Sequence, residues 1–184
     1  YYGNQDGKLK ISENAEAGSD YLSTVCSAWE NAALQNIDKV ERMAILRVGM
    51  VIGKNGGALE KMLPLFKRGL GGKLGSGKQF MSWIALEDEL RAIEFILNTA
   101  QIYGAVNLTS PNSVTNKKFT STLAQCLKRP AIFPMPEFMV KLLFGEMGEL
   151  LLLGGANVKP TVLLDNGFVF KYPDLDKAFQ ATLD

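Results

Sequence analysis

Residues 41–52 constrain the fold more than any other segment, because they form a nearly uninterrupted apolar run, Glu-Arg-Met-Ala-Ile-Leu-Arg-Val-Gly-Met-Val-Ile. A strand of this kind is typical of a parallel sheet whose two faces are both covered. Residues 79–86 also have the aromatic and β-branched content of a strand, and 104–109 form a third, shorter candidate. We therefore expect at least three strands, the first of them buried on both faces.

Segments with helical patterns separate these strands. Ser19 or Asp20 can cap a helix that runs to about residue 35 and has Tyr21 and Trp29 on or near its apolar face. Residues 57–68 also carry apolar side chains at helical intervals. Strands that alternate with helices indicate an α/β protein with a parallel sheet.

Two later helices continue this alternation. The helix expected at 87–100 directs four apolar side chains inward: Leu90, Ile93, Ile96 and Leu97. Thr115 is expected to cap a helix that ends at Arg129, because the residue before a proline disfavours helical geometry. The sequence therefore predicts a sheet domain that extends to residue 129.

From Pro130 onward the composition changes. Residues 137–153 form an apolar segment that is too short and too charged to span a bilayer. Its apolar stripe is expected to pack against the sheet domain or to bind a protein partner, and it contains Phe138, Leu142, Met147, Leu150 and Leu151. After it we expect a short helix, a strand at 167–170 and a last helix. Residues 130–184 are thus interpreted as a small, mainly helical lobe.

Composition limits the possible functions. The chain has 184 residues, of which 47% are hydrophobic, so it can bury one sizeable core. A formal net charge of +1 gives no electrostatic reason to expect nucleic acid or an anionic membrane as a partner. Histidine is absent, which removes Ser-His and Cys-His nucleophiles and His-based metal sites, and we expect no metal. Cys26 and Cys126 are expected to be reduced thiols, which favours the cytoplasm or the interior of an organelle.

Gly72, Gly77 and Lys78 have the spacing of a phosphate-binding loop, which is typical of nucleotide hydrolases. The next residue should be Ser or Thr to bind Mg²⁺, but it is Gln79. The loop should also follow a strand and open a helix, whereas here it follows a helical pattern and precedes a strand. These differences disfavour a nucleotide hydrolase.

Several short motifs carry a family resemblance when they are taken in order. They are Tyr-Tyr-Gly at 1–3, Leu-Arg-Val-Gly-Met-Val-Ile-Gly at 46–53, Ser-Trp-Ile at 82–84, Lys-Arg-Pro-Ala at 128–131 and Gly-Phe-Val-Phe at 167–170. The chain thereby resembles the extended short-chain dehydrogenase/reductase superfamily. More narrowly, it is similar to the atypical branch labelled epimerase-family or cell-division-inhibitor-like proteins. The resemblance covers nearly the whole chain.

The resemblance implies the C-terminal half of a Rossmann-type doubly wound parallel sheet that binds NADP(H), with an unidentified small molecule as substrate. The glycine-rich turn that holds the cofactor pyrophosphate is then expected upstream of Tyr1. The expected cofactor contacts are Tyr1, Arg47, Gly49, Met50 and Val51. The expected lining of the substrate cleft is Gln79, Ser82 and Trp83.

The superfamily's catalytic Tyr-x-x-x-Lys pattern is not intact in this chain. Counted from Glu30, the Lys position falls on Cys26 and the Tyr position on Leu22. A tyrosine with an ordinary pKa of about 10 is a poor base at pH 7 unless a cation lies beside it. Tyr2 is the remaining catalytic candidate. Two hypotheses stay open, a reductase- or epimerase-like enzyme and a non-catalytic cofactor-binding scaffold.

The identity of residue 81, a methionine, indicates which class of substrate is disfavoured. Sugar-nucleotide epimerases resemble residues 79–88 but carry an Arg near the start of that stretch, where this chain has Met81. A neutral thioether cannot pair with a diphosphate as a guanidinium does. The sequence therefore gives little support to a sugar nucleotide as substrate.

Overall fold

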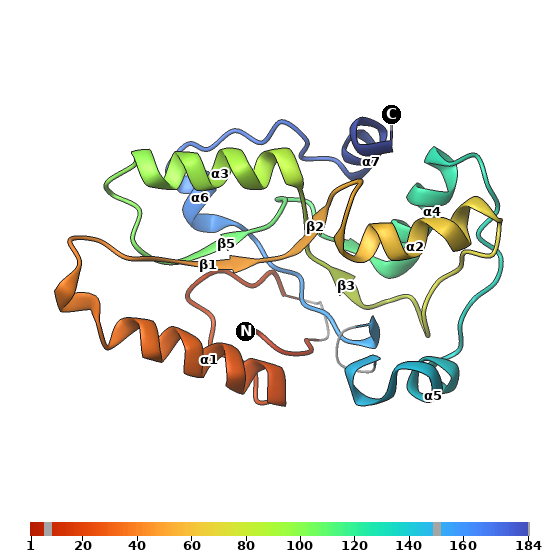
Figure 1. The fold of residues 1–184 in the computed structure, drawn as a ribbon, viewed down its shortest axis with the longest axis horizontal. Coiled ribbons are helices and arrows are strands. Elements are labelled where there is room, and N and C mark those ends of the chain that lie inside the picture. Colours follow the sequence, from red (N-terminus) through yellow and green to blue (C-terminus); the bar gives the residue numbers. More distant parts are fainter. Residues whose placement is uncertain (6–8, 149–151, 184) are drawn as a thin grey trace.

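The structure is a computed structural model that describes residues 1–5, 9–148 and 152–183 (Figure 1). Its strands are β1 (Ala44–Val48), β2 (Met50–Ile52), β3 (Phe80–Met81), β4 (Trp83–Ala85), β5 (Gly104–Leu108) and β6 (Val114–Thr115). Its helices are α1 (Tyr21–Leu34), η1 (Ile37–Lys39), α2 (Gly57–Lys67), α3 (Leu86–Asn98), α4 (Asn116–Cys126), α5 (Glu137–Gly148), α6 (Thr161–Asp165) and α7 (Leu175–Leu183).

Parallel pairing of strands dominates the fold, as the sequence predicted. β1 pairs with β5 in a register that runs from Ala44 opposite Gly104 to Val48 opposite Leu108. β2 pairs with β4, also in parallel. Figure 1 shows α3 on one side of the β1–β5 pair and α1 on the other. These features confirm the α/β class with helices on both sides of parallel strands.

The apolar run at 41–52 forms two strands instead of the single strand that its composition predicts. The break is at Gly49, whose N–H donates to Leu108 O at 3.0 Å, while the next N–H, of Met50, donates to Ser82 O at 2.8 Å. The chain therefore leaves β5 at this point and joins β4. A Cβ on Gly49 would lie 2.7 Å from Ser82 O and 2.8 Å from Thr109 Cγ2. Only glycine permits this close approach of backbones.

The stretch at 79–86 is divided in the same way. Ser82 separates β3 from β4, and β3 pairs antiparallel with β6 instead of continuing the parallel sheet. Alternation of apolar residues does not reveal such a switch of partner, because both halves keep the composition of a strand.

Two hydrophobic clusters form the core, and both draw on residues from either side of position 129. One cluster packs Trp83 and Phe119 with Phe179 of α7, and the rings of Phe119 and Phe179 lie 5.0 Å apart. The other packs Val106 of β5 with Leu163 of α6. The boundary between a domain at 1–129 and a lobe at 130–184 stays a prediction, and the lobe packs into the same core as the sheet.

The caps at the starts of two helices agree with the sequence. Asp20 caps α1 by accepting a hydrogen bond from Ser23 N at 2.9 Å, and Thr115 caps α4. The expected apolar face of α1 is wrong, because Tyr21 and Trp29 are 73% and 72% exposed. The buried residue of α1 is Ser23, which is small and polar.

The expected inward face of α3 is also partly wrong. Asp88, Ala92 and Ile96 are its buried residues, whereas Leu90 and Leu97 are 60% and 69% exposed. Residues four apart share a helix face, so burial of Asp88 places Ala92 and Ile96 on the buried face as well. The Asp88 carboxylate accepts hydrogen bonds from the backbone of residues 171 and 172 at 2.8 Å each, and this explains why a charged residue takes the buried position.

The C-terminal part differs from the prediction in two places. Gly145, with φ of 59°, interrupts α5, and Phe138 and Leu142 are 68% and 80% exposed instead of packing on the sheet. Three members of the expected stripe lie outside the described side chains: Met147, Leu150 and Leu151. The strand expected at 167–170 is absent, because the segment is irregular and is held by the packed rings of Phe168 and Phe170, 4.8 Å apart.

Candidate functional site

Two adjoining cavities lie beside the point where the chain passes from β1 to β2. The α1 cavity, of about 360 Å³, is enclosed by Cys26, Trp29 and Glu30 of α1 together with β1. The methionine cavity, of about 560 Å³, is lined by Met50, Met62 and Met81. The two share the lining residues Tyr1, Val48, Gly49, Ser82 and Val158, and the two adjoining cavities together are called the cleft.

Arg47 connects β1 to α1 on the wall of the α1 cavity. Its Nε and Nη2 donate to the two carboxylate oxygens of Glu30 at 2.8 Å each, which is the bidentate geometry of strong ion pairs. Its Nη1 donates to the Tyr2 hydroxyl at 2.9 Å and to Glu13 O at 3.0 Å. The charge of Arg47 is therefore neutralised within the protein and is not free to pair with a ligand.

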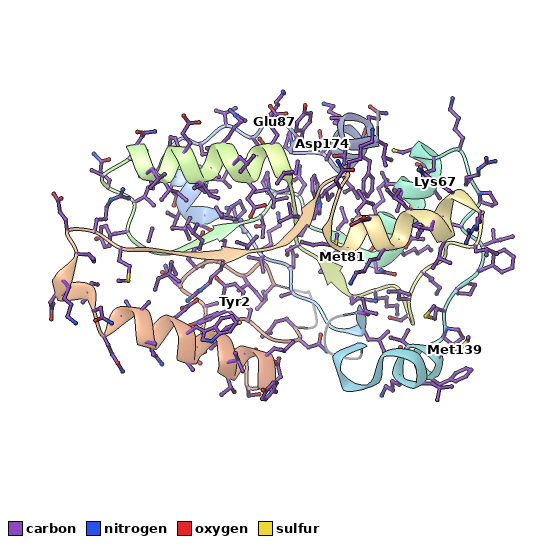
Figure 2. All side chains as sticks on the ribbon, viewed as in Figure 1. Tyr2, Lys67, Met81, Glu87, Met139 and Asp174 are labelled. Atoms are coloured by element: carbon purple, nitrogen blue, oxygen red, sulfur yellow. The ribbon has the colours of Figure 1, made fainter. Side chains whose placement is uncertain are left out.

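The two N-terminal tyrosines are held by this arginine. The guanidinium carbon of Arg47 lies 3.4 Å from the centroid of the Tyr1 ring, a cation–π contact. Tyr2 is 6% exposed, and its hydroxyl donates to Asn107 Oδ1 at 2.7 Å. Figure 2 shows Tyr2 on the side of β1 that faces α1. Both tyrosines line the α1 cavity, and the Tyr1 side chain is the less buried of the two.

The pKa values follow from this packing. Burial raises the pKa of Tyr2 above its ordinary value, and the hydrogen bonds from Arg47 and with Asn107 offset this only in part. Burial alone would lower the pKa of Arg47, but the hydrogen bonds to Glu30 and Tyr2 outweigh burial and raise it. At neutral pH Tyr2 is therefore a neutral phenol and Arg47 is a cation.

Glu13 and Asn107 extend the hydrogen-bond network of Arg47 and Tyr2. Glu13 is 8% exposed, and its carboxylate accepts from Asn107 N and from the first backbone N–H groups of α6, at Thr161 and Val162, each at 3.2 Å. Asn107 Nδ2 donates to Lys159 O at 3.0 Å. Sequence reasoning missed both residues. Glu13 lies in a polar segment without periodicity, so no local pattern marks it as buried.

The structure brings some of the residues predicted from the sequence together in the cleft. Tyr1, Tyr2, Arg47, Gly49 and Ser82 all line the α1 cavity. Met50 joins Tyr1, Gly49 and Ser82 in the lining of the methionine cavity.

Three other predicted residues lie elsewhere. Trp83 has no exposed surface, and its Nε1 donates to Asn112 O at 3.0 Å, so it is a core residue. Gln79 Nε2 donates to the carbonyls of Leu74 and Leu152 and holds two loops together. Val51 packs against the hydrophobic cluster beneath α3.

Ser82 lines both cavities, but its hydroxyl is already used. Ser82 Oγ donates to Ala156 O at 2.7 Å, accepts from Val158 N at 2.9 Å and lies 3.0 Å from Ser113 Oγ. These bonds fasten the segment at 156–158 across the strands. Ser82 is consequently interpreted as a structural residue of the cleft wall and not as a reactive group.

Comparisons with known proteins agree with this geometry. A family model described as a domain of unknown function (DUF1731) matches residues 135–182. An epimerase family protein of Mycobacterium bovis is 39% identical over 178 residues, which are 97% of this chain and 59% of the relative. The chloroplastic epimerase family protein SDR39U1 homolog of Arabidopsis thaliana is 39% identical over 183 residues, which are 100% of this chain and 52% of the relative.

A solved structure extends the similarity to three dimensions. The crystal structure of human epimerase family protein SDR39U1 with NADPH has a TM-score of 0.91 and 32% identity, and the match covers 99% of this chain and 61% of that one. The chain is thus similar to epimerase family proteins over nearly its whole length. Its Rossmann-type fold is thereby confirmed. The chain spans between about half and three fifths of the length of these epimerase family relatives.

Helix α1 contributes residues to both cavities. Leu22 lines the methionine cavity and Cys26 lines the α1 cavity. Cys26 is not in a disulfide, as expected. Within the described part of the chain, no lysine lines either cavity. Helix α1 therefore contributes an aliphatic side chain and a thiol to the walls of the two cavities.

Among residues 1–5, 9–148 and 152–183, no helix is long and apolar enough to cross a membrane. The same residues contain no group of three or more Cys, Asp or Glu side chains arranged to hold a metal ion.

Proposed function

We propose that this chain supplies the nicotinamide side of an NADP(H)-binding cleft in a reductase-like protein. The main support is the pair of joined cavities beside Gly49, formed by a chain that is 32% identical to a human relative solved with NADPH. Binding sites in open α/β sheets lie in the crevice at the carboxyl ends of parallel strands, and Gly49 directly follows the last residue of β1. The proposed cleft therefore has the expected location.

The proposed roles of the individual residues follow from their contacts. Tyr1, Gly49 and Met50 are proposed to contact the cofactor, because they line the cleft with accessible surface. Arg47 is proposed to position the Tyr1 ring and α1, since Glu30 already neutralises its charge. The cofactor phosphates are proposed to be bound by residues other than Tyr1, Gly49, Met50 and Arg47.

Tyr2 is proposed as a positioning residue and not as the catalytic acid or base. Its hydroxyl is 2.7 Å from Asn107 Oδ1 and 2.9 Å from Arg47 Nη1, and its pKa is raised. A general base at neutral pH needs a pKa near that pH. Tyr2, whose pKa is raised above 10, stays protonated at neutral pH and is therefore poorly suited to act as a base.

A non-catalytic cofactor-binding scaffold is the second candidate function. It is favoured by the bonded hydroxyls of Tyr2 and Ser82 and by the lack of lysine among the described residues of the cleft wall. The two candidates predict the same cofactor binding and differ only in turnover. Reduction of a panel of carbonyl compounds by the full-length protein separates them.

Cofactor binding can be tested on this chain because it has two tryptophans in contrasting places. Trp29 lines the α1 cavity, whereas Trp83 is buried in the core. NADPH should shift the indole N–H signal of Trp29 in NMR spectra and leave that of Trp83 in place, whereas ATP with Mg²⁺ should shift neither. We expect a dissociation constant on the order of 1 mM, because the glycine-rich segment at 69–77 follows α2 and precedes β3 and therefore cannot cradle a pyrophosphate at a helix N-terminus.

Two results would contradict the proposal. The absence of any Trp29 response to NADPH would remove the cleft as a cofactor site. An equal response to ATP with Mg²⁺ would indicate a general nucleotide site and not a nicotinamide site. The expected weak affinity has its own test, because micromolar binding of NADPH by this chain alone would indicate a pyrophosphate site within it.

A further inference from the structure

Apolar side chains make up much of the lining of the methionine cavity. Its walls carry three methionine side chains, and aliphatic or aromatic groups of Leu22, Leu74, Phe80 and Leu152 complete them. Thioethers and aliphatic groups offer polarisable apolar surface and weak hydrogen-bond acceptors. The walls are therefore suited to an apolar body of irregular shape.

Charge in this cavity has the wrong sign for a phosphate. Among the described residues that line it, Asp20 is the only charged one, and no lysine or arginine is present. The Asp20 carboxylate caps α1 through Ser23 N, and it remains an anion facing any ligand. A diphosphate would enter without a cation to pair with and would lose its hydration, which is costly.

The polar side chains around the cavity are already bonded within the protein. Asn116 Oδ1 accepts from Leu74 N at 2.8 Å, and Asn116 Nδ2 lies 3.4 Å from Met81 Sδ. Asn4 Oδ1 accepts from Gly155 N at 3.2 Å. Together with the bonded hydroxyl of Ser82, these contacts leave few groups for recognition of a sugar, which needs many hydrogen bonds.

Four basic side chains line a different cavity. That cavity, of about 600 Å³, is lined by Lys73, Lys117, Lys128 and Arg129, and it shares none of its described residues with the methionine cavity. A phosphate-bearing compound can therefore bind to this chain without entering the cleft. A test of the cleft needs a signal from the cleft itself.

We propose that the methionine cavity selects an uncharged, predominantly apolar molecule and excludes nucleoside-diphosphate sugars. This inference rests on the proposed function, in that the cavity adjoins the cofactor cleft through Gly49 and Ser82 and so receives the second ligand. The apolar body lies against Met50, Met62 and Met81, and its polar end faces the Tyr1 side of the cleft.

The test uses the methyl signals of ¹³C-labelled methionine in this chain. Met50, Met62 and Met81 report on the cavity, while Met43 and Met139 lie outside its lining and serve as internal controls. Figure 2 shows Met139 on α5, well separated from Met81. The probes are 2-nonanone as the apolar ketone and UDP-glucose as the anionic sugar nucleotide.

We expect 2-nonanone to shift the three reporter methyls saturably and UDP-glucose to leave them in place, even where it shifts signals of the basic cavity. Met81→Gln should weaken 2-nonanone binding about tenfold by setting an amide against its apolar chain, and Met81→Leu should preserve it within about threefold. Met50 and Met62 report the binding in both variants, and the unchanged control methyls establish that each variant is folded.

Two outcomes would overturn the inference. One is a saturable shift of the reporter methyls by UDP-glucose with an affinity equal to or above that of 2-nonanone. The other is a failure of 2-nonanone to move them at any soluble concentration. The Trp29 signal in the same sample reports NADPH separately, so a loss of the cofactor proposal and a loss of the ligand-class proposal give different spectra.

Discussion

Arg47 and Glu30 form a bidentate ion pair with both N–O distances at 2.8 Å, and this pair fixes α1 to β1 across the cleft. Both side chains are largely buried, at 10% and 15% exposed. The pair also sets the orientation of the Tyr1 ring, because the guanidinium plane is its packing surface. The shape of the α1 cavity therefore depends on two residues whose charges cancel.

Glu30→Ala tests this dependence. The substitution leaves a mostly buried guanidinium without its carboxylate, and we expect a loss of about 3 kcal/mol in the free energy of unfolding, the low end of the range for a broken buried pair. Urea denaturation followed by circular dichroism measures it. Glu16→Ala removes an exposed carboxylate and is the matched control. Equal stability of the two variants would show that the pair is not a structural contact.

Tyr2→Phe tests the buried hydroxyl. Its removal leaves Asn107 Oδ1 without its donor and Arg47 without one acceptor, so we expect a loss of about 1–3 kcal/mol at pH 7. Thermal or urea unfolding at that pH measures it. Tyr103→Phe, at a site that is 74% exposed, should have no measurable effect.

The raised pKa of Tyr2 adds a pH dependence. Its folded-state pKa lies above the unfolded value of about 10, so its contribution to stability is complete below about pH 10 and is lost as the pH rises through the folded-state pKa. The free energy of unfolding should fall as the pH rises above about 10 in the unmodified chain, and less steeply in Tyr2→Phe. Parallel curves for the two proteins would argue against a raised pKa at Tyr2.

Gly49→Ala tests the close approach at the strand switch. The added methyl would meet Ser82 O at 2.7 Å and Thr109 Cγ2 at 2.8 Å, so the backbone has to shift, at a cost of about 1–3 kcal/mol. Gly53→Ala is the control, because its Cβ would lie 3.5 Å from the nearest atom, a side-chain carbon of Leu86. Differential scanning calorimetry should show a lower Tm for Gly49→Ala alone. An equal Tm for both variants would contradict the steric argument.

Asp88→Ala tests the link between α3 and the C-terminal segment. Two backbone N–H groups, of Lys171 and Tyr172, lose their buried acceptor, and we expect a loss of about 3 kcal/mol. Hydrogen exchange of these two amides should accelerate beyond the global change. Glu87→Ala removes the exposed ion pair with Lys171 and should have a much smaller effect. Unchanged exchange at both amides would contradict the link.

The sequence predicted the strand and helix order because the signals for it are local. The apolar run at 41–52 and the caps at Asp20 and Thr115 each depend on a few neighbouring residues, and the structure has strands and helices there. The split at Gly49 was missed because it depends on Ser82 and Leu108, which are distant in sequence. A change of strand partner leaves no mark on local composition.

The cleft was predicted less completely for a similar reason. Gly49 and Met50 were found through the family resemblance, and both line it. Trp83 was interpreted as cleft lining, but an aromatic residue in a strand is equally suited to the core, where it lies. Glu13 gave no signal at all, because its partners are backbone groups more than ninety residues away.

Separate titrations with the two halves of the cofactor test whether this cleft binds nicotinamide. Reduced nicotinamide mononucleotide should shift the Trp29 indole and Met50 methyl signals of this chain, since both residues line the proposed nicotinamide cleft. Adenosine 2′,5′-bisphosphate should leave both signals in place at the same concentration. A response to the adenosine half with none to the nicotinamide half would contradict the account.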